Sequence, residues 1–331
     1  LVTDAEILLQ GLGLDVSEIP HVDSHEAHFD FEGRGLSIHM PGRHSLRIIR
    51  RDEFDAWLSA KARARGIEIK EGLTVKTVKP DDSGMVVETD AGVFHAAIVI
   101  GADGSNGIVR RCVLPSEPVY TARVLEVLAP PNQNPQHAVQ DAYFDFFAVP
   151  RGIAGYTWDF PTQLKGQPMR CWGIYDTNIL ADGKRAALKD TLAEEMARYG
   201  YNLADHELKG HPIRWFDPFN EISAPRVLLV GDAAGADPIF GEGISMALGY
   251  GRLAAREVLK AVETADFNLR GYRRRVMLSP LGQTLVARWF IAYIIYSLQW
   301  KWFQVLLWRM LKPLVTLVAW VFVLNWARRM R

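Results

Sequence analysis

The sequence has 331 residues, of which 38 are basic and 38 acidic, and this balanced charge disfavours a nucleic-acid-binding protein. Its two cysteines, Cys112 and Cys171, lack Cys-x-x-Cys spacing, so we expect buried thiols in a reducing compartment rather than a disulfide framework or a zinc site. The length allows two domains, because a single hydrophobic core stops growing at roughly 250 to 300 residues.

The first segment, residues 4–14 (DAEILLQGLGL), predicts the end of a helix that stops at glycine. Because the chain starts with Leu1 in what resembles the middle of a domain, we expect that an N-terminal portion precedes it. GLGLDVS, residues 11–17, superficially resembles a dinucleotide fingerprint. Such a fingerprint must follow a strand, so we interpret these glycines as a helix C-cap and turn.

The next segment, HVDSHEAHFDF, contains His21, His25 and His28 where a loop enters a strand. Their side chains need not converge and no complete ligand motif appears, so we expect no metal site. AHFDFEG and LSIHM alternate as a hairpin does. A helix is predicted over RRDEFDAWLSAKARARG, and IEIK, LTVKTV, MVVET and VFHAAIVIG predict strands after it.

A first candidate ligand site is IVIGADGSNGIVRR, residues 98–111. An apolar strand ends in glycine, Asp103 follows, and Gly104 keeps the turn open before a helix begins. Such a turn brings backbone N–H groups and one carboxylate against phosphate and ribose hydroxyls. An ordinary strand-to-helix turn has the same pattern, and the motif alone does not separate the two.

The middle of the chain, residues 114–215, is rich in strands and has one amphipathic helix in KDTLAEEMARYG, as an inserted second domain would. Within it, AGYTWDFPTQ places Tyr156, Trp158 and Phe160 on one face of a strand. Three rings in a row form either a packed sheet face, the commoner case, or the wall of an apolar binding site.

A second candidate site is VGDAAGADPIFGEGISMALGYG, residues 230–251. Asp232 follows an apolar strand, where open α/β sheets contact ligands, and can accept hydrogen bonds from polyol hydroxyls. Pro238 then bends the chain into Gly241, Glu242 and Gly243, whose N–H groups open a long helix. The partial positive charge of a helix N-terminus favours an anionic ring edge, such as that of reduced flavin.

The carboxyl-terminal segment is rich in tryptophan and aliphatic residues. Its uncharged run, residues 313–327, is shorter than the roughly 20 residues that a membrane-spanning helix needs. The Trp and Tyr content and the final arginines favour anchoring at a membrane interface. Helices packed over the inserted second domain, or at a dimer interface, are the alternative.

The two glycine-and-aspartate motifs, in this order, resemble those of the flavoprotein fold shared by p-hydroxybenzoate-hydroxylase-type monooxygenases and geranylgeranyl reductases. The resemblance implies that Asp103 and Gly104 belong to the DG motif, and that Asp232 of the GD motif binds the ribityl chain of FAD. GDAAG followed by P-x-x-G-E-G is similar to the reductase form. That stretch places Pro238, Gly241, Glu242, Gly243 and Ile244 at the cofactor.

Two further stretches are similar to motifs of this fold. RRDEFDAWL resembles its R-x-x-F-D-x-x-L helix start, which implies that Arg51 lies near the FAD phosphates and the backbone near Val75 meets adenine. YTWDFP resembles the Y-x-W-x-F-P motif of geranylgeranyl reductases. There, Tyr156, Trp158, Phe160 and Pro161 would border the prenyl-substrate cavity, so the cavity-wall interpretation becomes the favoured one. The W-x-W-x-I-P motif of flavin halogenases fits less well.

The resemblance implies an α/β chain with α+β elements. Its Rossmann-like FAD-binding domain, residues 1–113 and 216–275, lacks the GxGxxG unit and is interrupted by an antiparallel-sheet substrate domain at 114–215. Apolar, membrane-associated helices are expected at 276–331. We expect a cytoplasmic, peripherally membrane-associated protein.

The expected activity is FAD-dependent saturation of C=C bonds in a membrane-resident isoprenoid or prenyl lipid, with NADPH or another reductant as electron donor. The sequence identifies no catalytic acid. One alternative is an FAD-dependent monooxygenase or epoxidase acting on a lipophilic substrate. Another is a lipid-binding, membrane-associated fragment that has lost FAD.

Overall fold

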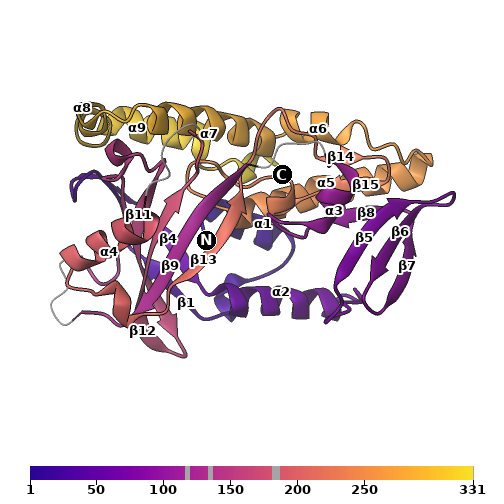
Figure 1. Cartoon of the computed structure of the whole chain (residues 1–331), viewed down its shortest axis with the longest axis horizontal. Coiled ribbons are helices and arrows are strands. Elements are labelled where there is room, and N and C mark those ends of the chain that lie inside the picture. The colour runs from indigo at the N-terminus through magenta and orange to yellow at the C-terminus, as the bar shows by residue number, and fades with distance from the viewer. Residues whose placement is uncertain (116–119, 133–136, 181–186, 331) are drawn as a thin grey trace.

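The computed structural model describes residues 1–115, 120–132, 137–180 and 187–330. Its sheets lie between helices that run above and below them (Figure 1). The α-helices are α1 (Thr3–Gly11), α2 (Arg51–Ala64), α3 (Ile108–Val113), α4 (Leu188–Arg198), α5 (Ile244–Thr264), α6 (Tyr272–Leu278), α7 (Pro280–Ser297), α8 (Lys301–Val305) and α9 (Lys312–Val318). The strands are β1 (His21–Ser24), β2 (Glu26–Asp30), β3 (Gly35–His39), β4 (Leu46–Ile49), β5 (Val75–Pro80), β6 (Met85–Thr89), β7 (Gly92–Ala96), β8 (Val99–Gly101), β9 (Thr121–Ala129), β10 (Ala142–Asp145), β11 (Gly155–Leu164), β12 (Gln167–Asp176), β13 (Lys209–Arg214), β14 (Ser223–Ala224) and β15 (Val227–Leu229).

The two glycine-and-aspartate motifs each follow a strand of one small sheet, whose order is β14-β15-β8. β15 and β8 run parallel, with Leu229 opposite Gly101, so both strands end at the same edge. Apolar residues of β15 and of α5, among them Met246 and Tyr250, are fully buried in one core. This packing brings the apolar strand and the long helix of small residues into one core.

A seven-stranded sheet forms the other half of the molecule, in the order β13-β9-β12-β11-β10-β2-β3. β2 joins it by pairing in parallel with β10, so that Ala27 lies opposite Ala142. The strands β2 and β3, which the division by sequence placed in the first part of the FAD-binding domain, therefore extend the substrate sheet.

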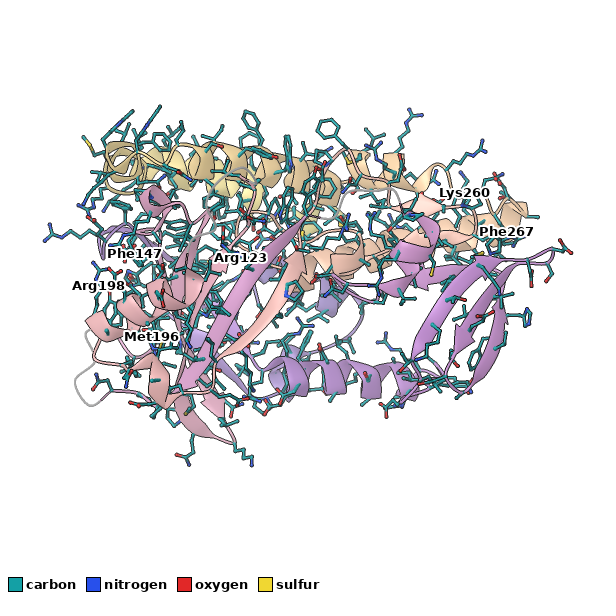
Figure 2. All side chains as sticks on the ribbon, in the orientation of Figure 1. Arg123, Phe147, Met196, Arg198, Lys260 and Phe267 are labelled. Carbon is teal, nitrogen blue, oxygen red and sulfur yellow. The ribbon has the colours of Figure 1, made fainter. Side chains whose placement is uncertain are left out.

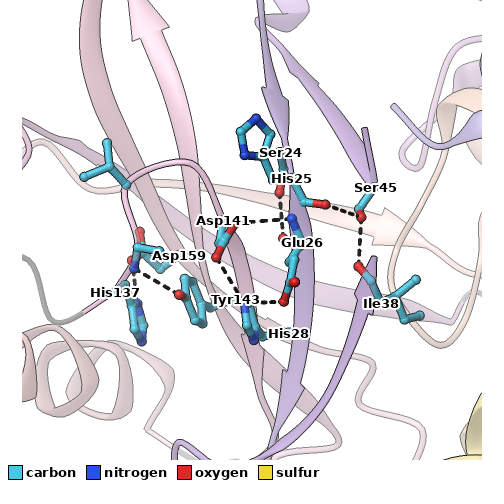
Figure 3. Close-up of polar contacts among 12 residues, drawn as sticks. Ser24, His25, Glu26, His28, Ile38, Ser45, His137, Asp141, Tyr143 and Asp159 are labelled. Atoms are coloured by element: carbon cyan, nitrogen blue, oxygen red, sulfur yellow. Dashed lines mark hydrogen bonds and ion pairs between the residues drawn. The ribbon is translucent and has the colours of Figure 1, made fainter. Parts of the chain in front are cut away.

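Polar contacts hold β2 and β3 to the rest of this sheet (Figure 3). The Asp141 carboxylate accepts from the Glu26 N–H at 3.2 Å and lies 3.3 Å from Nε2 of His28. The Ser45 hydroxyl bridges the carbonyls of His25 and Ile38. His28 therefore helps to hold the sheet together. Among the described residues, no group of three or more His, Cys, Asp or Glu side chains is placed to hold a metal ion.

The two faces of the seven-stranded sheet are covered by different helices. α4 covers one face, where Phe147 and Met196 are buried and the Arg198 guanidinium lies 5.1 Å from the Phe147 ring centroid (Figure 2). The other face carries an aromatic layer against α7 and the C-terminal segment. Trp158 lies flat across β12 in this layer because Gly173 has no side chain, and a Cβ there would come within 2.0 Å of the indole.

The C-terminal helices run side by side along the top of the molecule in Figure 1. α8 and α9 each continue into a π-helical turn, Leu306–Met310 and Ala319–Val323. Over the described residues no single helix has the length and apolar character to cross a bilayer. Two pairs of bent helices pass the same length and composition test, Tyr272–Leu278 with Pro280–Ser297 and Lys301–Met310 with Lys312–Met330.

Two expectations from the sequence are wrong. IEIK, residues 67–70, forms no strand, because β5 begins only at Val75 after an exposed connection. Cys112 is exposed rather than buried, since it lies on the outer side of the short helix α3. Burial raises the pKa of the other thiol, Cys171, to about 12.

A group of carboxyls beneath the aromatic layer makes stability depend on pH. Burial, with the charge of Asp145 beside it, raises the pKa of Asp30 from 3.8 to about 6. The folded chain therefore binds more protons than the unfolded chain between these values, so the free energy of unfolding falls as pH rises through this window.

We expect Asp30→Asn to be more stable than the wild type at pH 8 and to lose part of this pH dependence. Urea unfolding at pH 5 and pH 8 measures both effects. Asp82→Asn, at an exposed position, is the matched control. An Asp30→Asn variant with the same pH dependence as the wild type would contradict the assignment.

Candidate functional site

The larger candidate cavity opens at the shared carboxyl edge of β8 and β15, where open α/β sheets bind ligands. Its volume is about 920 Å³. Both motif turns contribute to its wall, through Gly104 after β8 and Gly231 with Asp232 after β15. The remaining wall comes from α1, α2, α5 and β13, including Leu8, Arg51, Phe54, His211, Ile213, Ile244, Ala247 and Leu248.

Asp232 presents a carboxylate to this cavity. Burial raises its pKa above the ordinary range, while Arg51 and His211 pull it back. Within the described ranges no hydrogen bond is found to this carboxylate, although neighbouring aspartates are bonded. An acceptor of this kind, half-buried in a cavity wall, is suited to bind a ligand hydroxyl.

A sharp turn at residues 241–244 opens helix α5 beside Asp232. Gly241 has a φ of +65°, which favours glycine, and a Cβ there would come within 2.8 Å of the Tyr175 ring. Gly243 is the N-cap of the 21-residue helix, which starts at Ile244. The Glu242 carboxylate accepts from the Ser245 N–H at 2.8 Å. The Gly241 N–H donates to the Asp237 carbonyl, and the N–H groups that follow it in this turn carry the partial positive charge of the helix end.

A smaller, mostly apolar cavity of about 380 Å³ lies on the other side of this turn. Arg51, Gly241, Gly243 and Ile244 line both cavities, so the two share a wall. The apolar lining comes from β2, β3, β4, β10 and β11, from the loop before the 241–244 turn and from the C-terminal segment: Ala27, Phe29, Ile38, Leu46, Ile48, Phe144, Phe160, Phe240, Val323 and Leu324.

The structure separates the four residues expected to border the substrate. Phe160 lines the apolar cavity. Tyr156 and Trp158 lie on the same face but behind the wall, 4% and 8% exposed. Pro161 points to the opposite face, as alternation requires, and lines a separate surface hollow. Tyr156 and Trp158 are thus core residues of the aromatic layer, and Phe160 alone of the four reaches this cavity.

The residues expected at the cofactor are also distributed unevenly. The Asp103 carboxylate accepts from the Val109 N–H at 2.9 Å and so caps α3 instead of facing the cavity. Val75 packs against the core at the start of β5, outside the lining of the larger cavity. Pro238 is buried, and its carbonyl accepts from the Tyr175 hydroxyl at 3.3 Å. Arg51 does line the cavity, and it pairs with Asp55 at 3.2 Å.

Sequence reasoning missed the contributions of the two ends of the chain. Asp4 of α1, Arg288 of α7 and residues 323–325 all line the apolar cavity. The Asp4 carboxylate accepts from the Asn325 and Ala327 N–H groups, both at 2.9 Å, and so joins these ends. One signal was present: Arg288 is the single charged residue of α7, and a lone charge in an apolar helix needs a buried partner.

A family model described as an FAD binding domain matches residues 8–250. An uncharacterized protein of Methanosarcina barkeri is 30% identical over 232 residues, which are 70% of this chain and 57% of that protein. Digeranylgeranylglycerophospholipid reductase 3 of Methanosphaera stadtmanae is 29% identical over 228 residues, 67% of this chain and 56% of that protein. The chain thus spans less than two thirds of either relative.

Among solved structures, a geranylgeranyl bacteriochlorophyll reductase-like protein from Thermoplasma acidophilum superposes with a TM-score of 0.71 at 20% identity. The superposition covers 97% of this chain and 82% of that one. This likeness shows a shared fold. With the family match extending over both motif turns and the start of α5, the chain belongs to the family of FAD-binding domains.

Proposed function

We propose that this chain is the core of an FAD-dependent reductase that saturates C=C bonds of an isoprenoid lipid. One observation carries the proposal: a large cavity with charged side chains in its wall and a smaller, mostly apolar cavity meet at a single turn, residues 241–244. A cofactor in the first would meet an apolar substrate in the second at that turn. The similarity to a digeranylgeranylglycerophospholipid reductase supports the substrate class.

The larger cavity suits FAD in its chemistry. Asp232 supplies a carboxylate acceptor for a ribityl hydroxyl, and the α5 N-terminus supplies N–H groups for the pyrimidine edge of the flavin. Arg51 supplies a cation at the same wall. When bound and reduced, by NADPH or a reductant of similar strength, FAD supplies a hydride.

The residues of the apolar cavity bind the substrate and exclude water. Phe29, Phe144 and Phe160 present rings to it, and Ile38 and Ile48 present branched chains. Burial of apolar surface stabilises by about 25 cal/mol per Å². The binding free energy of an isoprenoid segment therefore grows with the apolar area that it buries, and the segment needs no polar groups to bind. Its double bond is thereby placed next to the 241–244 turn.

We propose that the outer face of the C-terminal segment binds a membrane surface. Phe290, Trp302, Trp320 and Phe322 are 50% to 62% exposed on this face. Lysines and arginines accompany them, at Lys301, Lys312, Arg328 and Arg329. Aromatic residues with adjacent basic groups suit the headgroup region of an anionic bilayer. The two thiols are free, which supports a reducing, cytoplasmic location.

The same segment connects this outer face to the apolar cavity. Trp320 and Phe322 are exposed, and Val323 and Leu324, directly after them, line the cavity. The Thr284 hydroxyl holds this strip by donating to the Phe322 carbonyl at 2.6 Å. A lipid substrate would therefore pass from the bilayer into the cavity without crossing water.

We expect the double variant Trp320→Glu, Phe322→Glu to bind vesicles of neutral and anionic phospholipid at least about tenfold more weakly, because two apolar side chains no longer insert. Vesicle co-sedimentation measures the effect. Phe94→Glu, at an exposed ring of β7, is the control and should bind as the wild type does. Equal binding of all three proteins would contradict the membrane assignment.

The activity is tested on the full gene product that contains this chain, in vesicles, without oxygen, with reduced FAD and a geranylgeranyl lipid. A product heavier by a pair of hydrogen atoms per reduced bond supports the proposal. Reduced flavin that persists beside unchanged lipid would overturn it. Incorporation of oxygen into the lipid when air is admitted would instead identify a monooxygenase.

A further inference from the structure

The loop that leads into the 241–244 turn is held by three buried tyrosine hydroxyls from three different elements. Tyr156 of β11 donates to the Phe240 carbonyl at 2.6 Å, and Tyr296 of α7 donates to the Ile239 carbonyl at 2.7 Å. Tyr175 of β12 lies 3.3 Å from the Pro238 carbonyl. All three tyrosines are at most 4% exposed. The Tyr175 hydroxyl is also 3.4 Å from the Asp237 carbonyl, so the carbonyls of residues 237–240 are all within hydrogen-bond distance of one of these three hydroxyls.

A buried ion pair fixes the start of the same loop. The Arg288 guanidinium of α7 lies 2.6 Å from the Asp237 carboxylate, and the two side chains are 3% and 0% exposed. The other carboxylate oxygen of Asp237 accepts from the Ile239 N–H at 2.8 Å. The Asp237 carbonyl accepts from the Gly241 N–H at 3.0 Å. The position of Asp237 therefore determines where Gly241, and with it the turn, begins.

The loop is thus held by three tyrosines and one arginine, and two of these four side chains come from a helix outside the matched FAD-binding domain. The family match ends at residue 250, whereas α7 starts at Pro280. The inner side of α7 nevertheless supplies Arg288 and Tyr296 to the loop, which is part of the GD motif. Its outer side carries Phe290, on the face assigned above to the membrane.

We propose that α7 completes the FAD site, with Arg288 and Tyr296 acting as positioning residues that set the N–H groups of the 241–244 turn against the flavin. This inference rests on FAD binding in the proposed function but not on the identity of the substrate. Tyr156 acts on the same loop from the opposite side, which gives a physical role to the first residue of the YTWDFP stretch.

Loss of one hydroxyl leaves a buried carbonyl without a partner, and the loop then moves to find another. The N–H groups that follow it lose their alignment with the flavin edge that becomes negative on reduction. FAD binding should weaken, and the reduced form should be destabilised more than the oxidised form. The reduction potential should therefore become more negative.

The test uses the full gene product with oxidised and reduced FAD and no lipid substrate. Tyr296→Phe is compared with Tyr293→Phe, one turn earlier on α7, whose hydroxyl makes no hydrogen bond among the described residues. We expect Tyr296→Phe to raise the FAD dissociation constant about fivefold to tenfold and to make the reduction potential more negative. Tyr293→Phe should change neither. Titration of flavin fluorescence and dye-coupled potentiometry are the measurements.

A second pair of variants distinguishes a specific loss of FAD binding from a general loss of stability. Arg288→Lys keeps a cation opposite Asp237, whereas Arg288→Met removes it, so FAD affinity should follow the order wild type, Lys, Met. The melting temperature of the FAD-free protein is measured alongside. A lowered melting temperature with unchanged FAD affinity and potential would overturn the inference, as would equal behaviour of Tyr296→Phe and Tyr293→Phe. A wild type that binds FAD but reduces no lipid would overturn the proposed substrate alone.

Discussion

Asp232→Asn is expected to weaken FAD binding by about 10- to 100-fold, because a hydrogen bond to a charged acceptor contributes more than one to a neutral group. The carboxylate faces the larger cavity and has no partner in the described part of the chain, so its whole acceptor capacity is available to the ribityl hydroxyls. The amide keeps the shape but presents a donor on one side.

The measurement is a titration of FAD against the full gene product, followed by flavin fluorescence. Asp190→Asn, at an exposed site in the first turn of α4, is the control and should leave the affinity unchanged. Because burial raises the pKa of Asp232, the affinity of the wild type should fall on acidification as the carboxylate takes up a proton. An Asn variant that binds as tightly as the wild type would show that FAD does not use this group.

The two motif turns were predictable because their chemistry is local. Each has a glycine and an aspartate at or within three residues of the end of an apolar strand, and those features follow from neighbouring residues alone. The structure places both turns at one sheet edge, as parallel strands require. The start of α5 at Ile244 also follows from the glycines that precede it.

The roles of individual side chains were less predictable, because a motif does not say which way a side chain points. Asp103 turns back to cap α3, while Gly104 beside it lines the cavity. Tyr156 and Trp158 share a face with Phe160, and alternation predicts that correctly. Only the absence of a side chain at Gly173 on the neighbouring strand lets Trp158 lie down into the core. Such cross-strand fits depend on pairing register, which the sequence does not state.

The walls of the apolar cavity were the hardest part to predict, since they combine segments from both ends of the chain. Asp4 and Asn325 meet although more than 300 residues separate them. No periodicity within either segment indicates that contact. The lone Arg288 of α7 was the one local sign that the C-terminal segment reaches the site, because a buried charge needs a partner elsewhere in the fold.

Ile38→Trp is expected to block the apolar cavity and leave the cofactor site intact. Ile38 lies on β3, half-buried, in the wall of the apolar cavity but not in that of the larger one. A bulkier ring there competes with the isoprenoid for the same space. We expect kcat/KM for a geranylgeranyl lipid to fall about tenfold or more, while the FAD dissociation constant stays unchanged.

A control variant with a tryptophan at an exposed position shows whether the loss of turnover comes from filling the cavity or from adding a tryptophan anywhere in the protein. Val93→Trp on β7, where Val93 is 57% exposed, should retain wild-type turnover and FAD affinity. If Ile38→Trp lowers FAD affinity as strongly as turnover, the two cavities are one site for the cofactor. If turnover with the lipid is unaffected, the isoprenoid binds elsewhere. If the two cavities are separate sites that meet at the 241–244 turn, Ile38→Trp should lower lipid turnover and leave FAD affinity unchanged. The cofactor then remains bound in one cavity, while the lipid substrate is excluded from the other.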